Sequence, residues 1–184
     1  MLIINEVFES IQGEATHTGR PSIFIRLQGC PVGCSFCDTK YTWSNSVGVS
    51  DEDIFTRRKK DGGHAWQEDD LLDEIQHRYT ARHIVITGGE PCTQEIHRLC
   101  NEAIFRRFSV QLETSGTYEI NVPQDVFVTV SPKINMAGGK VILEECLRRA
   151  NEIKFPVGKM SDVEKLDVLL AGRVMSNIWL QPLS

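Results

Sequence analysis

Three cysteines within eight residues are the strongest chemical feature of this sequence: Cys30-Pro-Val-Gly-Cys34-Ser-Phe-Cys37. The proline and glycine inside this run disfavour a regular helix, so we expect a loop that turns all three thiolates toward one centre. Three thiolates from one short loop suit an iron–sulfur cluster, and a four-iron cluster with three protein ligands keeps one iron free.

The same cysteines leave two other readings open. A structural zinc ion takes four protein ligands, so a zinc knuckle would need a fourth ligand from Cys92, Cys100, Cys146 or a distant histidine. A bacterial-type ferredoxin uses a longer cysteine run. A simple electron carrier is therefore the weaker reading of the loop.

A glycine-rich segment, Ile86-Thr-Gly-Gly-Glu-Pro91, is the second candidate for chemistry. Glycines at the end of a strand allow the main chain to approach a ligand closely. The carboxylate of Glu90 could bind an ammonium group. Taken alone, a Gly-Gly-Glu segment is most often only a turn.

The composition limits the class of protein. With 184 residues, 41% hydrophobic and 24% charged, the chain is expected to form one globular domain over residues 1–184 rather than a disordered segment. Its 20 basic and 25 acidic residues disfavour nucleic acid as the main partner. No apolar run reaches the about 18 residues of a membrane helix. The N-terminus does not resemble a signal peptide, so we expect a cytoplasmic protein without structural disulfides.

Strands and helices alternate along the chain. Strands are expected at 3–8, 22–28, 83–87, 109–113, 126–130, 152–155 and 178–180, and helices after residue 68, around 96–104, at 140–150 and after Ser161. This order predicts an α/β fold with parallel strands, an open or incomplete (β/α) barrel with six strands between residues 22 and 181. The active groups should lie at the carboxyl ends of these strands, where the polar and glycine-rich segments fall.

The remaining candidates are read as structural. His17, His64, His77, His83 and His97 follow no ligand spacing, and Cys92, Cys100 and Cys146 are expected to be free thiols. The three tryptophans are expected to pack rather than to stack on a ligand. Arg26, on a strand that ends at the cysteine loop, can bind a carboxylate with two parallel hydrogen bonds, or it can form an ordinary surface ion pair.

The cysteine spacing, with Phe36 before the last cysteine, resembles that of the radical S-adenosylmethionine (SAM) superfamily, and the Gly-Gly-Glu segment resembles the superfamily's glycine motif. Within that superfamily, the chain is similar to the 7-carboxy-7-deazaguanine synthase family from about residue 6 to its end. The similar runs are residues 8–14, 19–21, 37–43, 113–117, 131–133 and 180–182, together with Arg26.

The resemblance assigns roles by position and names no catalytic side chain beyond those that hold the cofactors. It implies that a [4Fe–4S] cluster is held by Cys30, Cys34 and Cys37, and Mg²⁺ by Thr39. It implies SAM contacts from Phe36, Cys37, Asp38, Gly89, Ser131, Pro132, Lys133, Gln181, Pro182, Leu183 and Ser184. It implies substrate contacts from Ile11, Gln12, Gly13, Arg26 and Thr87.

The implied reaction is that of a carbon–nitrogen lyase in queuosine biosynthesis, a pathway of tRNA modification. Reductive cleavage of SAM would generate a radical that takes a hydrogen atom from 6-carboxy-5,6,7,8-tetrahydropterin. The ring would then contract to 7-carboxy-7-deazaguanine, with loss of ammonia and regeneration of SAM. The resemblance also implies a reducing partner such as flavodoxin and a homodimer. The charge balance and the lack of a long apolar run predict no nucleic acid or membrane partner.

Three points qualify this reading. Family members continue past the Gln-Pro strand, whereas this chain ends at Ser184, so the family's C-terminal segment is expected to be absent. An activase of glycyl-radical enzymes is the alternative enzyme, although it should lack the features at residues 11–13 and Thr39. A metal-stabilised binding domain is the non-enzymatic alternative, and it predicts zinc and no reaction with SAM.

Overall fold

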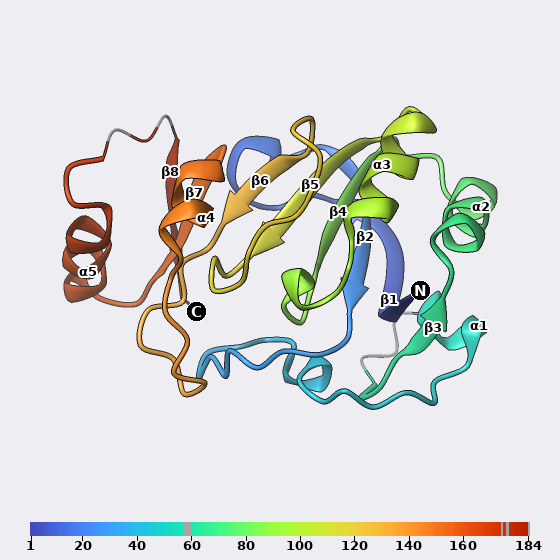
Figure 1. Ribbon diagram of the computed structural model, residues 1–184, viewed down its shortest axis with the longest axis horizontal. Coiled ribbons are helices and arrows are strands. Elements are labelled where there is room, and N and C mark those ends of the chain that lie inside the picture. Colours follow the sequence, from blue (N-terminus) through green and yellow to red (C-terminus); the bar gives the residue numbers. More distant parts are fainter. Residues whose placement is uncertain (57–59, 174, 176, 184) are drawn as a thin grey trace.

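The computed structural model describes residues 1–56, 60–173, 175 and 177–183 (Figure 1). The strands are β1 (Leu2–Ile11), β2 (Pro21–Leu27), β3 (His64–Trp66), β4 (His83–Gly88), β5 (Ser109–Thr114), β6 (Phe127–Val130), β7 (Glu152–Val157) and β8 (Ile178–Pro182). The α-helices are α1 (Asp51–Ile54), α2 (Glu68–Arg78), α3 (His97–Phe105), α4 (Glu144–Arg149) and α5 (Met160–Leu170). Short 3₁₀ turns lie at η1 (Ala15–His17), η2 (Lys40–Thr42) and η3 (Pro91–Thr93).

The strands of the described residues form one sheet in the order β3-β1-β2-β4-β5-β6-β7-β8. Strand β1 pairs antiparallel with both β2 and β3, whereas neighbours from β2 to β8 run parallel. The sheet is curved and does not close, so the predicted open α/β architecture with six parallel strands is confirmed. The arrowheads of these strands point to one edge, along which the loops after the strands lie (Figure 1).

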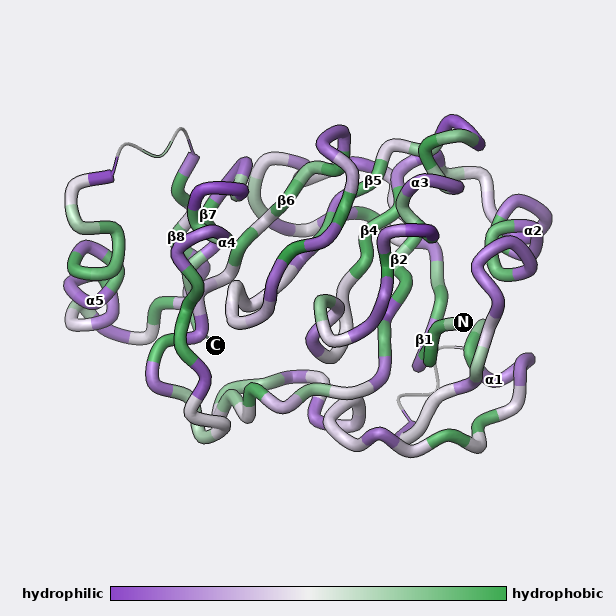
Figure 2. Tube along the Cα trace, viewed as in Figure 1, coloured by the Kyte–Doolittle hydropathy of each residue, from purple (hydrophilic) through white to green (hydrophobic). Residues whose placement is uncertain are grey.

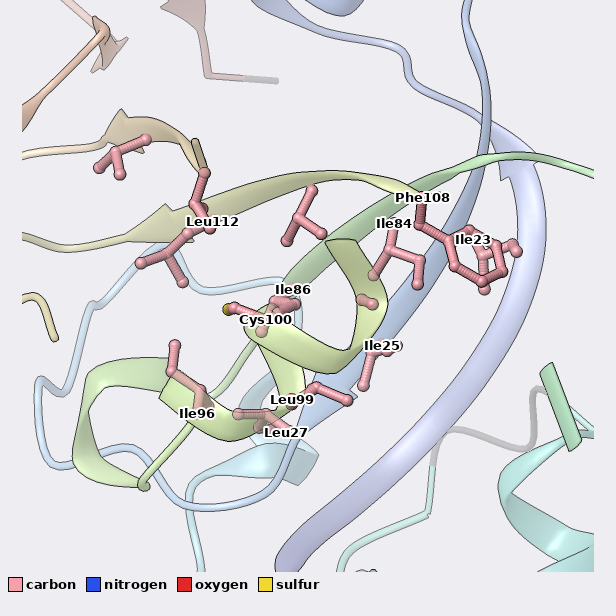
Figure 3. Close-up of a cluster of buried hydrophobic side chains, with 14 of the residues drawn as sticks. Ile23, Ile25, Leu27, Ile84, Ile86, Ile96, Leu99, Cys100, Phe108 and Leu112 are labelled. Carbon is pink, nitrogen blue, oxygen red and sulfur yellow. The ribbon is translucent and has the colours of Figure 1, made fainter. Parts of the chain in front are cut away.

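Side-chain alternation along the strands separates the core from the site. In β2, Ile23, Ile25 and Leu27 are fully buried. They lie beside apolar residues of β4 and β5 and beneath helix α3 (Figure 3). The residues between them, Phe24 and Arg26, line a cavity instead. Because successive side chains of a strand point to opposite faces, the apolar face packs against helices while the polar face remains available for chemistry.

The hydropathy of the chain follows this division. Figure 2 shows hydrophobic residues along much of the central strands and hydrophilic residues on parts of helices α2 and α5. None of the helices formed by the described residues is both long enough and apolar enough to cross a membrane.

Several element boundaries differ from those expected. Strand β1 is longer than 3–8, and β3 was not predicted. The helix expected over 140–150 is only Glu144–Arg149, and Val141, expected to face inward, is 72% exposed. The N–H of Leu143 donates to the Gly116 carbonyl at 2.8 Å. This contact ties the preceding residues to another loop, so the helix begins after it.

Two helix starts also differ from expectation. Helix α3 begins at His97, one residue after the expected start at 96. Helix α5 begins at Met160, where the Asp162 carboxylate accepts the N–H groups of Gly158 and Lys159, both at 3.1 Å. A carboxylate in the first turn satisfies donors that the helix itself leaves free.

Candidate functional site

A cavity of about 680 Å³ lies at the carboxyl ends of the parallel strands. All but three of the predicted site residues line it: Gln12, Gly13, Arg26, Cys30, Cys34, Phe36, Cys37, Asp38, Thr39, Thr87, Gly89, Ser131, Lys133, Gln181, Pro182 and Leu183. Ile11 is 62% exposed at the end of β1, and Pro132 is buried outside the lining. Ser184 lies outside the described residues.

The cysteine loop reaches the cavity as an irregular turn. Gly29 and Gly33 have φ angles of +97° and +70°, which glycine adopts most readily. The N–H groups of Gly29 and Cys30 donate to the carbonyls of Thr42 and Trp43, at 2.7 and 3.2 Å. The loop is therefore held at its start by the segment that follows the last cysteine.

Burial favours the protonated form of two of the loop thiols, Cys30 and Cys34. It raises the pKa of Cys30, and it raises the pKa of Cys34 to about 11, with further contributions from the neighbouring loop thiols. Metal ligation requires thiolates, so a positively charged centre would offset this cost. No three His, Cys, Asp or Glu side chains of the described residues are grouped to hold a single metal ion.

The other cysteines lie away from the cavity lining. Cys100 and Cys146 are fully buried, and burial raises the pKa of each to about 12. The Cys146 thiol donates to the Tyr118 carbonyl at 3.1 Å. Burial also raises the pKa of Cys92. These environments suit unreactive thiols.

The two glycines of the Gly-Gly-Glu segment lie close to the main chain of neighbouring segments. A Cβ atom on Gly88 would lie 2.3 Å from the Leu27 nitrogen, and one on Gly89 would lie 2.0 Å from the Gly29 oxygen. The N–H of Gly89 donates to the Leu27 carbonyl at 2.9 Å. The segment therefore rests directly on the start of the cysteine loop, which is a further reason for glycine at these positions.

Glu90 is also engaged by the chain itself. Its carboxylate accepts the N–H groups of Cys92 at 3.1 Å and Ser115 at 2.8 Å. It also accepts the hydroxyl of Thr114 at 2.6 Å and that of Ser115. Only 1% of the residue is exposed. The carboxylate therefore links the ends of β4 and β5.

Arg26 forms an ion pair, but with a buried partner rather than at the surface. Its Nε donates to Oε1 of buried Glu6 at 2.6 Å, and the same oxygen accepts the Tyr41 hydroxyl at 3.0 Å. Among the described residues, the terminal guanidinium nitrogens have no hydrogen-bond acceptor. The ion pair thus fixes the side chain while leaving these two donors for a molecule in the cavity.

The residues around the last cysteine lie close together. The Thr39 hydroxyl lies 3.5 Å from Sγ of Cys37, and Thr39 is 8% exposed. Across the cavity, Nζ of Lys133 donates to Oγ of Ser131 at 2.5 Å and lies 5.9 Å from the centre of the Phe36 ring. Burial lowers the pKa of Lys133, while Cys34 acts in the opposite direction. An anion in the cavity would favour its charged form.

A buried charged group was not predicted from the sequence. Nζ of Lys154 donates to Oε2 of Glu14 at 2.6 Å and to Oε2 of Glu113 at 2.8 Å. Gln12 donates to the other Glu113 oxygen at 3.0 Å. All four residues line the cavity. The available signal was a lysine between the apolar residues Ile153 and Phe155 of a strand, because lysine is rarely buried without a partner.

A second polar row crosses the same face of the sheet. His83 of β4 contacts Gln111 of β5 at 3.1 Å, Gln111 donates to Thr129 of β6 at 2.9 Å, and Thr129 donates to Glu152 of β7 at 2.7 Å. Burial lowers the pKa of His83 to about 4. The histidine is therefore neutral near pH 7, as its structural reading requires.

Comparisons with known proteins agree on one family. The model of the radical SAM superfamily matches residues 24–125. The chain is 52% identical over 172 residues to 7-carboxy-7-deazaguanine synthase of Escherichia coli (strain K12), covering 91% of this chain and 77% of that protein. It is 43% identical over 189 residues to the synthase of Buchnera aphidicola subsp. Schizaphis graminum, covering 98% and 84%.

A solved structure shares the fold. The crystal structure of QueE from Escherichia coli superposes with a TM-score of 0.94 at 49% sequence identity. The match covers 99% of this chain and 83% of the crystal chain. The likeness therefore extends over the cavity and over the strands that form it.

Proposed function

The chain belongs to the radical SAM superfamily and, within it, to the 7-carboxy-7-deazaguanine synthase family. From this premise we propose that it acts as a carbon–nitrogen lyase. It converts 6-carboxy-5,6,7,8-tetrahydropterin to 7-carboxy-7-deazaguanine and ammonia in queuosine biosynthesis. When bound, a [4Fe–4S] cluster and SAM supply the radical chemistry, and the protein supplies binding, orientation and charge.

One observation carries the proposal. A single cavity joins three cysteines of one loop to polar side chains from the inner face and ends of β2, β4, β5, β6, β7 and β8. Such a cavity can hold a metal centre, a charged cosubstrate and a polar ring together. The three thiols fit a cluster that keeps one iron open, since Cys92, Cys100 and Cys146 do not line the cavity.

On this proposal, the cofactors and the substrate occupy different walls of the cavity. SAM lies against Phe36, Cys37, Asp38, Gly89, Ser131, Pro132, Lys133 and the strand end at residues 181–184. The buried ammonium of Lys133 suits the SAM carboxylate, because charge-assisted hydrogen bonds are strong in a poorly hydrated site. Gly89 contributes main-chain atoms, and Pro132 supports the segment from outside the lining.

The substrate lies on the wall formed by β1, β2 and β4. Arg26, already fixed by Glu6, has two donors in the parallel geometry that a carboxylate requires. Gln12, Gly13 and Thr87 line the same wall. Ile11, whose side chain points away from the lining, contributes only through its main chain.

Magnesium and the macromolecular partners are further parts of the proposal. Thr39 provides one oxygen to Mg²⁺, and the substrate carboxylate and water provide the others. A reducing protein such as flavodoxin supplies the electron. We also propose a homodimer, which is supported by the exposed apolar side chains of Ile178, Trp179 and Leu180 on edge strand β8. The molar mass in solution, measured by light scattering, tests the dimer.

The deciding experiment is an anaerobic assay with reductant, SAM and the carboxypterin, followed by mass spectrometry of the product. The reconstituted protein should form 7-carboxy-7-deazaguanine. Cys34→Ala should lose the cluster and all turnover, whereas Cys146→Ala should keep its iron and sulfide. Zinc in place of iron, or SAM cleavage without pterin conversion, would contradict the proposal.

A further inference from the structure

The cysteine loop is enclosed by main chain on two sides. On one side, the carbonyl of Gly29 accepts the N–H of Glu90 at 2.9 Å, and Gly89 leaves no room there for a side chain. This contact joins the loop to the end of β4. It belongs to the glycine motif already described.

The second side is covered by residues 131–143, the loop between β6 and α4. The N–H of Gly138 donates to the carbonyl of Val32 at 3.0 Å. A Cβ atom on Gly138 would lie 2.0 Å from the carbonyl oxygen of Pro31 and 2.8 Å from that of Val32. Figure 1 shows the two loops side by side at the lower left. Because both neighbours are main-chain atoms, any larger residue at 138 must separate the loops.

The 131–143 loop touches the cysteine loop near both of its ends. At its start, Lys133 lies over the ring of Phe36, between two of the cysteines. Further along, Gly138 rests on Pro31 and Val32, between Cys30 and Cys34. The end of the loop is fixed at Leu143 by the Gly116 carbonyl. Movement of the cysteine loop would therefore move residues 131–133 with it.

We propose that Gly138 is a positioning residue that holds the cysteine loop against residues 131–133. It thereby sets the distance between the cluster and the SAM contacts. The inference rests on the proposed function for the identity of the groups that are placed, but not for the contact itself. A residue other than glycine at this position should loosen the cysteine loop without touching any ligand.

The adjacent glycine provides a matched control. Gly139 has a φ angle of +63°, and a Cβ atom there would meet nothing within 4 Å. Gly138 is not in the left-handed region, and its Cβ atom would collide with the cysteine loop. Gly139→Ala therefore adds only backbone strain, whereas Gly138→Ala adds only the contact between loops.

The first test uses the protein without its cluster. Alkylation rates of individual thiols are measured by mass spectrometry in wild type, Gly138→Ala and Gly139→Ala. Cys34, which is 7% exposed, should be alkylated about tenfold faster in Gly138→Ala, corresponding to about 1.4 kcal/mol of overpacking. Cys100, fully buried in the core, reports global unfolding and should stay slow. Equal Cys34 rates in all three proteins, or equal acceleration in both variants, would overturn the inference.

The second test uses the reconstituted enzyme. At matched iron content, Gly138→Ala should bind SAM about tenfold more weakly, which corresponds to about 1.4 kcal/mol of overpacking. The electron paramagnetic resonance spectrum of its cluster should also respond to SAM differently from that of wild type. Gly139→Ala should match wild type in both. Unchanged SAM affinity and spectrum in Gly138→Ala would also overturn the inference. A wild-type protein that binds no iron would instead contradict the proposed function, while the alkylation result would still decide the role of Gly138.

Hydrogen exchange of the wild type covers the case in which Gly138→Ala does not fold. Exchange at residues 134–141 should slow when the cluster is reconstituted, because the cysteine loop then becomes rigid. Exchange that is the same with and without the cluster would show that the two loops are not coupled.

Discussion

At the scale of single residues, the charge of Lys154 depends on its two carboxylate partners. Burial alone would lower its pKa, but Glu113 and Glu14 raise it above the usual value. Lys154→Met should destabilise the protein by about 3 kcal/mol, since it leaves buried carboxylate charge without a partner. This value is at the lower end of the usual cost of breaking a buried ion pair, because the side chain of Glu14 is 39% exposed. Urea unfolding at pH 7 measures the change.

An exposed ion pair supplies the control for this prediction. Lys165 pairs with Asp162 at 2.9 Å on the surface of α5. Lys165→Met should therefore change the free energy of unfolding much less than Lys154→Met does. If both variants lost the same amount, the loss could not be attributed to burial of Lys154.

The hydroxyl of Thr39 provides a second test at this scale. One neutral oxygen is a poor Mg²⁺ site, so the ion should bind well only with the substrate carboxylate present. Magnesium should accelerate turnover of wild type and of Thr39→Ser, and much less that of Thr39→Ala. Steady-state rates with and without Mg²⁺, at matched cluster content, measure the response. The Thr42 hydroxyl donates to the main-chain carbonyl of Thr39, so a change of the Thr39 side chain leaves this turn intact. An equal response to Mg²⁺ in all three proteins would remove Thr39 from the metal site.

Residue types and spacing were enough to predict the cysteines and Arg26 as cavity residues, whereas Thr39 was predicted only from the family resemblance. They were not enough for Glu90, whose donors come from Thr114, Ser115 and Cys92. Which donors reach a buried carboxylate depends on how strands and loops pack. The contact of Gly89 with Gly29 also depends on this packing. It joins residues that are distant in the sequence, so no local sequence pattern predicts it.

At the scale of elements, the parallel sheet could be predicted from the alternation within strands. Pairing between segments that are distant in the sequence could not be predicted. Strand β3 has three residues, and it exists because Leu2, Ile3 and Ile4 pair with them. Helix α4 is shorter than its hydrophobic pattern indicates, because the Gly116 carbonyl holds Leu143. Local patterns thus placed most elements, and long-range hydrogen bonds set their ends.

The polar row across β4 to β7 should make stability depend on pH. His83 has a pKa of about 4 in the folded protein, against a usual value of 6.5, because of burial. Unfolded chains therefore bind more protons between these values, so stability is lost as pH falls from about 6.5 toward 4, by about 1.4 kcal/mol per unit. His17, packed on the His83 ring and also with a lowered pKa, acts in the same direction.

Urea unfolding of His83→Gln at pH 7, 6 and 5 tests this dependence. The variant should lose less stability on acidification than wild type, by about 1 kcal/mol per pH unit. The exposed His77 of helix α2 is the control, and His77→Gln should keep the slope of wild type. If the slope of His83→Gln were also unchanged, the histidine would not be buried in its neutral form.

At the scale of the whole molecule, an open sheet brings segments from residue 12 to residue 183 around one cavity. The alternation of strands and helices predicts this edge, because parallel strands end on the same side. The alternation of strands and helices does not predict the curvature of the sheet or the loop contacts that enclose the cavity. They depend on main-chain contacts, such as that of Gly138 with Val32.

The final prediction concerns stabilisation of the whole fold by its cofactors. A molecule that binds only the folded state stabilises it, by about 2.7 kcal/mol at one hundred times its dissociation constant. For a chain of this size, SAM should therefore raise the melting temperature of the cluster-loaded protein by about 5–10 °C.

In protein without the cluster, the same SAM concentration should have a much smaller effect, because the cluster would supply part of the proposed SAM site. Thermal unfolding under anaerobic conditions is measured with and without the cluster and with and without SAM. Cys146→Ala, which keeps the three loop thiols, is the control and should respond like wild type. An equal shift in both cluster states would mean that SAM is held by the strand ends and Lys133 alone. It would then follow that cluster and cosubstrate bind this cavity independently.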